Sequence, residues 1–69
     1  MTLDQVKERH PRWEFISFEY GRWTSTHENY DVSWEGEEDG WCSNGLMAEG
    51  RTLEELADDM ANIEEERGL

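Results

Sequence analysis

The sequence is poor in the residues that several common protein classes depend on. It has one cysteine and one proline among 69 residues, so no disulfide can form within the chain. No apolar run approaches the roughly 20 residues that cross a bilayer, and residues 1–11 lack the apolar stretch of a secretory signal. We therefore expect a cytoplasmic protein.

Positive charge is also scarce. Six Lys and Arg stand against 18 Asp and Glu, which gives a formal net charge of -12 at pH 7. A surface of this sign is repelled by nucleic acid phosphates and by anionic membranes. The composition therefore argues against direct nucleic acid binding and membrane binding, and it predicts that a partner selected by charge is basic.

The negative charge is concentrated in the second half of the chain. Residues 1–27 hold four acids and four bases, whereas residues 28–66 hold fourteen acids and the single base Arg51. Any function that depends on acidity is therefore expected after residue 27.

The apolar content is sufficient for one small core. Hydrophobic residues make up 35% of the chain and aromatic residues 12%, and each aromatic side chain can bury roughly 150–250 Å². We expect a single domain over residues 1–69, with the four tryptophans in its core and Cys42 as a semi-buried structural residue.

The first half of the chain predicts a short helix followed by strands. Thr2 and Gln5 fit a capping box and Pro11 stops a helix, which gives a helix over residues 3–10. Alternating aromatic and β-branched residues predict a strand over residues 13–20 and another over residues 22–26. In the first of these strands, regular alternation places Trp13, Phe15 and Ser17 on one face and Ile16, Phe18 and Tyr20 on the other.

The middle of the chain predicts further short strands. Tyr30, Val32 and Trp34 alternate with polar residues, which is typical of a half-buried strand with an acidic outer edge. A polar loop over residues 36–40 then leads to a short strand over residues 41–43, and Asn44-Gly45 is a strong turn signal. Residues 46–48 are compatible with a further strand, and the sequence leaves that open.

The clearest helix lies at the C-terminal end. Thr52 and Glu55 fit a second capping box, and Gly68 is a typical helix stop, so the helix is expected to run to about Arg67. Its apolar residues recur at helical spacing and should pack on the strands: Leu53, Leu56, Ala57, Met60 and Ile63. The fold class predicted is α+β, with an αβββα-like order and a three- or four-stranded antiparallel sheet.

No pattern in the sequence is typical of an enzyme or of a metal site. Cys42 with His10 or His27 has neither the spacing of zinc ligands nor support as a thiol-imidazole pair. The acidic loop at residues 37–39 lacks the alternating ligands of a calcium loop. We expect no catalytic residues, no metal and no cofactor.

The acidic residues of the second half are the candidate partner-binding site. On the predicted helix they lie away from the apolar face, where residues three or four apart are about 5–6 Å from each other. Such a row of carboxylates resembles the phosphates of DNA, and we expect it to continue from the helix to the sheet edge. The candidates are Glu28, Asp31, Glu35, Glu37, Glu38, Asp39, Glu54, Glu55, Asp58, Asp59, Glu65 and Glu66.

Residues 40–61, GWCSNGLMAEGRTLEELADDMA, resemble the strand-turn-helix segment of HicB-like antitoxins. The resemblance implies an antiparallel sheet with a helix across it and a small RNA-cleaving toxin as partner. Many members carry a DNA-binding segment after this helix, and we expect none in this protein.

In size, acidity and aromatic content the chain also resembles phage-encoded inhibitors that imitate DNA, namely anti-CRISPR and anti-restriction proteins. That resemblance implies a non-enzymatic inhibitor of a basic nucleic-acid-binding partner in a bacterial host, such as a CRISPR Cascade complex or a restriction enzyme. It transfers no individual residue. The sequence leaves both alternatives open, the DNA mimic and the antitoxin.

Overall fold

The computed structural model describes residues 1–69 and has the predicted α+β class. In chain order the elements are α1 (Leu3–Arg9), β1 (Trp13–Glu19), β2 (Arg22–His27), β3 (Val32–Trp34), β4 (Trp41–Ser43), β5 (Met47–Gly50) and α2 (Leu53–Arg67). The strands form a three-stranded antiparallel sheet of order β1-β2-β5 and a separate two-stranded sheet of β3 and β4. Of residues 46–48, left open by the sequence, residues 47–48 belong to β5.

Both helices begin at the predicted threonine caps. The Thr2 hydroxyl accepts from the Gln5 N–H and the Gln5 side chain accepts from the Thr2 N–H, which completes the first capping box. Thr52 accepts from the Glu55 N–H, but the Glu55 carboxylate accepts from the Arg51 N–H instead of closing the second box. Neither helix is long and apolar enough to cross a membrane.

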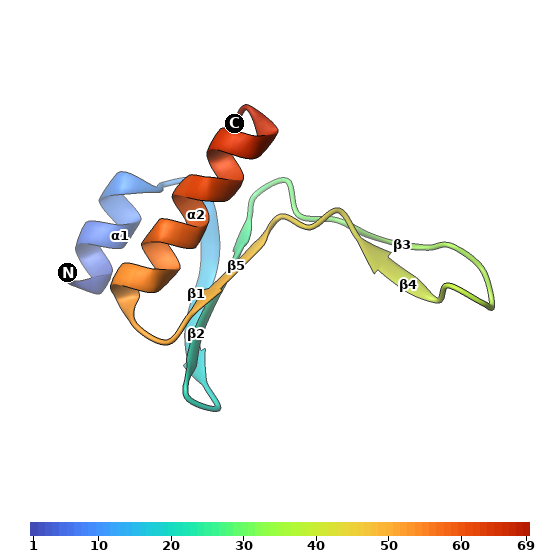
Figure 1. Ribbon diagram of the computed structural model, residues 1–69, viewed down its shortest axis with the longest axis horizontal. Coiled ribbons are helices and arrows are strands. Elements are labelled where there is room, and N and C mark those ends of the chain that lie inside the picture. The colour runs from blue at the N-terminus through green and yellow to red at the C-terminus, as the bar shows by residue number, and fades with distance from the viewer.

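Helix α2 packs on the sheet through the predicted apolar residues. Leu56, Ala57 and Met60 are buried, and Leu53 and Ile63 pack against them at the margin of the core. Figure 1 shows both helices on the same side of the three-stranded sheet. At the C-terminal end Gly68 adopts a left-handed conformation with a φ of 68°, which ends α2 at Arg67 as expected.

A β-bulge in β1 changes which residues face the helices. Trp13 pairs with His27, but the register shifts by one residue between Glu14 and Ser17. Ile16 therefore joins the core beside Trp13, whereas Phe15 has a φ of 54° and is 81% exposed. The predicted grouping of Trp13, Phe15 and Ser17 on one face is wrong, because regular alternation does not survive an extra residue.

The tryptophans divide between the core and the surface. Trp13 is buried and Trp23 packs against the core, as predicted. Trp34 and Trp41 are 54% and 71% exposed, so the core prediction is wrong for these two. They lie on the two-stranded sheet, which no helix covers.

The two-stranded sheet belongs to a projecting hairpin, residues 28–46, which we call the arm. The β2–β5 pairing ends at Thr26 opposite Met47, and the β3–β4 pairing begins at Val32 opposite Ser43. The segment that joins β2 to β3 is therefore two residues longer than the segment that joins β4 to β5. The ribbon bends there and extends from the body along the longest dimension of a molecule measuring 42 × 30 × 16 Å (Figure 1). The strand expected over residues 30–35 is present as β3, but all three of its residues are exposed, so the expectation that it is half-buried is wrong.

Candidate functional site

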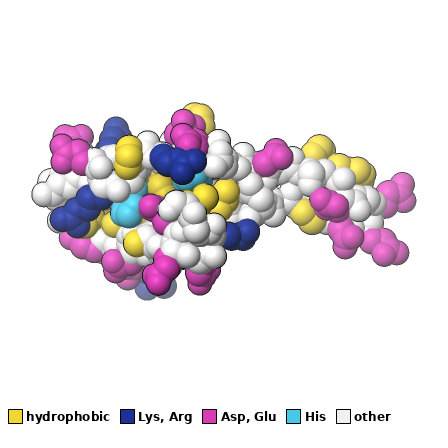
Figure 2. Space-filling view, turned by 90° about the horizontal axis from the view of Figure 1, so that it is seen from above, with side chains coloured by type: hydrophobic (Ala, Val, Ile, Leu, Met, Phe, Trp, Pro, Cys, Tyr) yellow, Lys and Arg dark blue, Asp and Glu magenta, His cyan; other side chains and the backbone are white.

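The twelve predicted acidic residues lie on two separate surfaces. The arm carries Glu28, Asp31, Glu35, Glu37, Glu38 and Asp39, and α2 carries Glu54, Glu55, Asp58, Asp59, Glu65 and Glu66. Because the arm extends away from the body, the row expected to run from helix to sheet edge is divided in two (Figures 1 and 2). All of these residues are exposed except Asp59, which is partly buried.

The base of the arm is held by polar contacts. The Glu28 carboxylate pairs with Arg12 of the body at 2.5 Å. The Asn44 side chain donates to the Asn29 carbonyl at 2.7 Å, and the Asn44 backbone N–H donates to the Asp31 carbonyl at 3.0 Å. These bonds satisfy the backbone where the two strands differ in length, and they fix the direction in which the arm leaves the body.

The end of the arm is a tight acidic loop. Gly36 and Gly40 both have positive φ, which glycine adopts more readily than other residues, and the Gly40 N–H donates to the Gly36 carbonyl at 2.7 Å. Between them Glu37, Glu38 and Asp39, which we call the tip acids, are exposed and have no ion-pair partner. Residues 28–46 contain six acids and no Lys or Arg, a net charge of -6.

An exposed tryptophan pair lies directly before the tip. The Asn44 N–H donates to the Asp31 carbonyl, and the Glu35 N–H donates to the Gly40 carbonyl. Hydrogen-bonded and non-hydrogen-bonded residue pairs therefore alternate between these two bonds. Trp34 and Trp41 then face each other at a non-bonded position, where side chains approach most closely. Their rings make an edge contact with centroids 5.5 Å apart. Figure 2 shows hydrophobic side chains mainly along one side of the arm and acidic side chains on the other side and at the end.

Sequence reasoning missed this pair as a surface feature. Its signal was the shortness of the two strands, only three residues each, together with the polar segments on both sides of them. A two-stranded ribbon of that length is not expected to form a core of its own, and the arm projects away from α2 (Figure 1).

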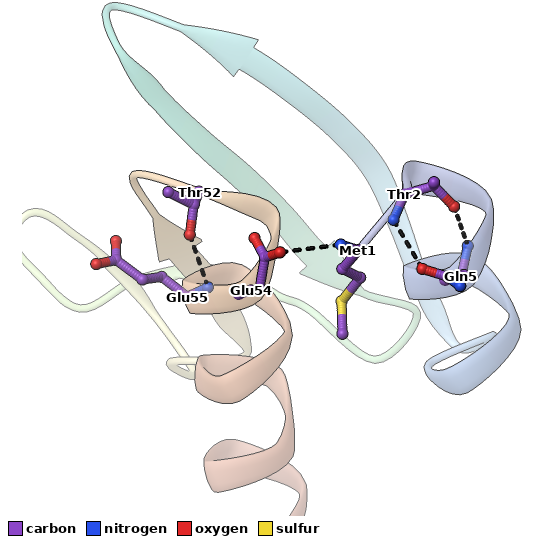
Figure 3. Close-up of polar contacts among 6 residues, drawn as sticks. All are labelled: Met1, Thr2, Gln5, Thr52, Glu54 and Glu55. Atoms are coloured by element: carbon purple, nitrogen blue, oxygen red, sulfur yellow. Dashed lines mark hydrogen bonds and ion pairs between the residues drawn. The ribbon is translucent and has the colours of Figure 1, made fainter.

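On α2, half of the predicted site residues already have partners within the chain. Figure 3 shows Glu54 bonded to the N-terminal ammonium of Met1, at 2.9 Å. That hydrogen bond, a bond to its own backbone and the ammonium charge hold the pKa of Glu54 below its ordinary value. Glu55 accepts from the Arg51 N–H and Asp59 from the Glu49 N–H, at 2.7 and 2.9 Å.

The other three acids of α2 are free for a partner. Asp58, Glu65 and Glu66 are exposed, and their side chains have no hydrogen-bond or ion-pair partner in the chain. They form a smaller acidic surface than the arm.

One acidic residue that the sequence did not single out has a structural position. Glu64 accepts from the Trp13 indole N–H at 3.2 Å and also contacts the Nδ1 atom of His10. It therefore links α2 to the end of α1 and the start of β1, and it is not part of either acidic surface.

The remaining candidates for chemistry in the sequence are metal ligands and Cys42. No cluster of three or more His, Cys, Asp and Glu side chains is placed to hold a metal ion. Cys42 is exposed on the arm, where its Sγ contacts the Asp39 carbonyl at 3.7 Å, so its expected semi-buried position is wrong. The two hollows of the surface lie between β5 and α2 and are lined by polar and charged residues and Gly50.

Comparison of the chain with protein-family models, with curated proteins and with solved structures finds no match.

Proposed function

We propose that this protein is a non-enzymatic inhibitor whose acidic surface takes the place of DNA on a basic nucleic-acid-binding partner. A CRISPR Cascade complex or a restriction enzyme in the cytoplasm of a bacterial host is a partner of this kind. The observation that carries the proposal is the arm, which has six acids and no Lys or Arg and holds its tip acids away from every base in the chain.

The physical basis is a match of charge density. Duplex DNA carries one negative charge per roughly 1.7 Å of its axis, and proteins that bind it line their grooves with Lys and Arg. The arm presents its carboxylates on a narrow two-stranded ribbon, which can enter such a groove. The free acids of α2, Asp58, Glu65 and Glu66, add a second region of the same sign.

An affinity capture from bacterial lysates tests this function. The tagged protein should retain a DNA-binding protein or complex, and both duplex DNA and high salt should release it, because charge pairs are screened over about 3 Å in molar salt. Recovery of partners that neither salt nor duplex DNA displaces would contradict the proposal.

Charge reversal separates the arm from a general effect of net charge. Replacing the tip acids by lysine (Glu37→Lys, Glu38→Lys, Asp39→Lys) should weaken binding at least about tenfold, which is roughly 1.4 kcal/mol shared among three contacts. The matched control Glu8→Lys, Glu14→Lys, Glu19→Lys changes the net charge equally at exposed sites outside both surfaces. Equal losses in the two variants would show that location does not matter.

A HicB-like antitoxin is the second candidate. The segment that carries the resemblance, residues 40–61, contains β4, β5 and the first part of α2, and the packing of α2 on the sheet is compatible with this alternative. Such a protein would neutralise a small RNA-cleaving toxin. In the same capture experiment it would retain one small basic ribonuclease, encoded by a neighbouring reading frame, in place of a DNA-binding complex.

A further inference from the structure

We propose that the arm recognises arginine in its partner, with Trp34 and Trp41 stacking on guanidinium groups while the neighbouring carboxylates pair with them. This inference rests on the proposed function for the basic nature of the partner. It adds to that function that the arm, and not α2, makes the selective contact, and that the cation selected is arginine.

The arm places aromatic faces and free carboxylates within a few residues of each other. Trp34 and Trp41 form the last cross-strand pair before the loop that carries the tip acids, so both rings lie next to the acidic tip. Glu35 accepts from the Ser33 hydroxyl, at 2.6 Å, on the face of the ribbon opposite Trp34, so it is not one of the carboxylates beside the rings. A cation that reaches the end of the arm on the tryptophan side therefore meets an indole face and the tip acids.

The two tryptophans are not needed to complete the core of the protein. The core consists of residues from α1, β1, β5 and α2, with Trp23 packed against it, and it includes no residue of β3 or β4. Trp34 and Trp41 contact each other through ring edges and remain more than half exposed. Large exposed aromatic residues on a projecting element are typical of interaction sites, where tryptophan is among the residues that contribute most binding energy.

The chemistry of this surface favours arginine over lysine. The guanidinium group is planar and weakly hydrated, so it stacks on an indole ring and still donates two parallel hydrogen bonds to a carboxylate. An ammonium group is strongly hydrated and acts as a point charge, and it gains less from an aromatic face. Tryptophan is the aromatic side chain that attracts cations most strongly.

Charge complementarity determines the class of occupant. The arm has a net charge of -6 and the chain -12, so phosphates of nucleic acids and anionic lipid headgroups are repelled from it. A second copy of the arm would bring together two surfaces of the same sign. The occupant that fits both the rings and the carboxylates is an arginine-bearing segment of a protein.

The experiment compares fluorescently labelled nonaarginine and nonalysine peptides, which have the same length and charge, in anisotropy titrations with the full chain. Stacking on an exposed indole contributes about 0.5–1 kcal/mol, so the two rings should tighten nonaarginine binding roughly 5- to 30-fold relative to the Trp34→Ala, Trp41→Ala variant. They should tighten nonalysine binding less, which makes the preference for arginine greater in the natural protein. The matched control Phe15→Ala removes an aromatic side chain that is 81% exposed outside the arm, and it should leave the preference unchanged.

Two further measurements distinguish loss of the indole rings from loss of the arm's structure in the alanine variant. The Trp34→Phe, Trp41→Phe variant keeps the aromatic face with weaker cation attraction and should show an intermediate preference. In NMR titrations of the natural protein with nonaarginine, the indole N–H signals of Trp34 and Trp41 should shift while that of the buried Trp13 stays in place. The inference is overturned by equal preference in the natural protein and the double alanine variant, or by indole signals of the arm that do not move.

The peptide titrations and the capture experiment together distinguish failure of this inference from failure of the proposed function. Selective binding of nonaarginine by a protein that captures no nucleic-acid-binding partner would retain the inference and remove the function. Capture that is sensitive to the tip acids but unaffected by Trp34→Ala, Trp41→Ala would retain the function and remove the inference.

Discussion

Individual contacts divide the acidic residues of this protein into those that hold the fold and those that are free. Glu54, Glu55 and Asp59 accept from the N-terminal ammonium or from backbone N–H groups, whereas Glu37 and Glu38 have no ion-pair partner. The sequence predicts that all five are acidic surface residues. It cannot separate the two kinds, because the partners of the first kind come from other segments of the chain.

Glu54→Gln should remove a pH-dependent part of the stability. The pKa of Glu54 in the folded protein is lowered by its hydrogen bond with the N-terminal ammonium, so the ionised carboxylate favours folding. This contribution is present above the ordinary value of 4.5 and is lost as the pH falls through the lowered value. Thermal unfolding should therefore separate the variant from the natural protein near neutral pH and show equal midpoints in acid.

The matched control for that variant is Asp58→Asn, which removes an exposed carboxylate from the middle of the same helix that has no partner. A gap between Glu54→Gln and the natural protein that persisted unchanged in strong acid would contradict the role of the ion pair.

At the scale of elements, the sequence is most informative where one residue type determines a local structure. Thr2, Thr52 and Gly68 mark helix ends that the structure confirms within one residue. The sequence does not predict the bulge in β1, because Phe15 adopts positive φ there without being glycine. The position of the arm was equally hidden, since pairing between distant strands decides it.

Gly50→Ala should be strongly destabilising although it adds one methyl group. The backbone of β5 passes so close to the first turn of α2 that a Cβ at Gly50 would lie 2.4 Å from the Leu56 nitrogen. Either β5 or α2 must shift, and overpacking of this kind costs about 1–3 kcal/mol. Urea unfolding followed by circular dichroism measures the loss.

The neighbouring Glu49→Ala provides the control, because its exposed side chain makes one loose ion pair with Arg22, at 3.6 Å. It should change the free energy of unfolding by no more than about 0.5 kcal/mol. Similar losses for Gly50→Ala and Glu49→Ala would show that the close approach of β5 to α2 does not constrain the fold.

For the whole molecule, the net charge destabilises the compact state and the shape of the fold reduces that effect. A net charge of -12 on 69 residues favours expansion of the chain, because like charges repel one another in the compact state. The fold reduces this repulsion by placing six of the acids on an arm that extends from the body (Figure 1). Composition predicts the repulsion, but only the bend at the base of the arm shows how it is distributed.

Unfolding experiments at low and high salt test this distribution. The screening length falls from about 30 Å at 0.01 M to about 3 Å at 1 M, so the unfolding temperature should rise with added salt. Glu65→Gln, Glu66→Gln should raise stability at low salt by about 0.6–2 kcal/mol, because both carboxylates oppose the negative end of the α2 dipole, and should weaken the salt dependence. Glu37→Gln, Glu38→Gln removes the same charge from the end of the arm and should change the unfolding temperature much less, because the arm extends away from the body and its acids. Equal stabilisation by the two variants would mean that the tip acids destabilise the folded state as much as the acids of α2 do. The arm would then not reduce the charge repulsion.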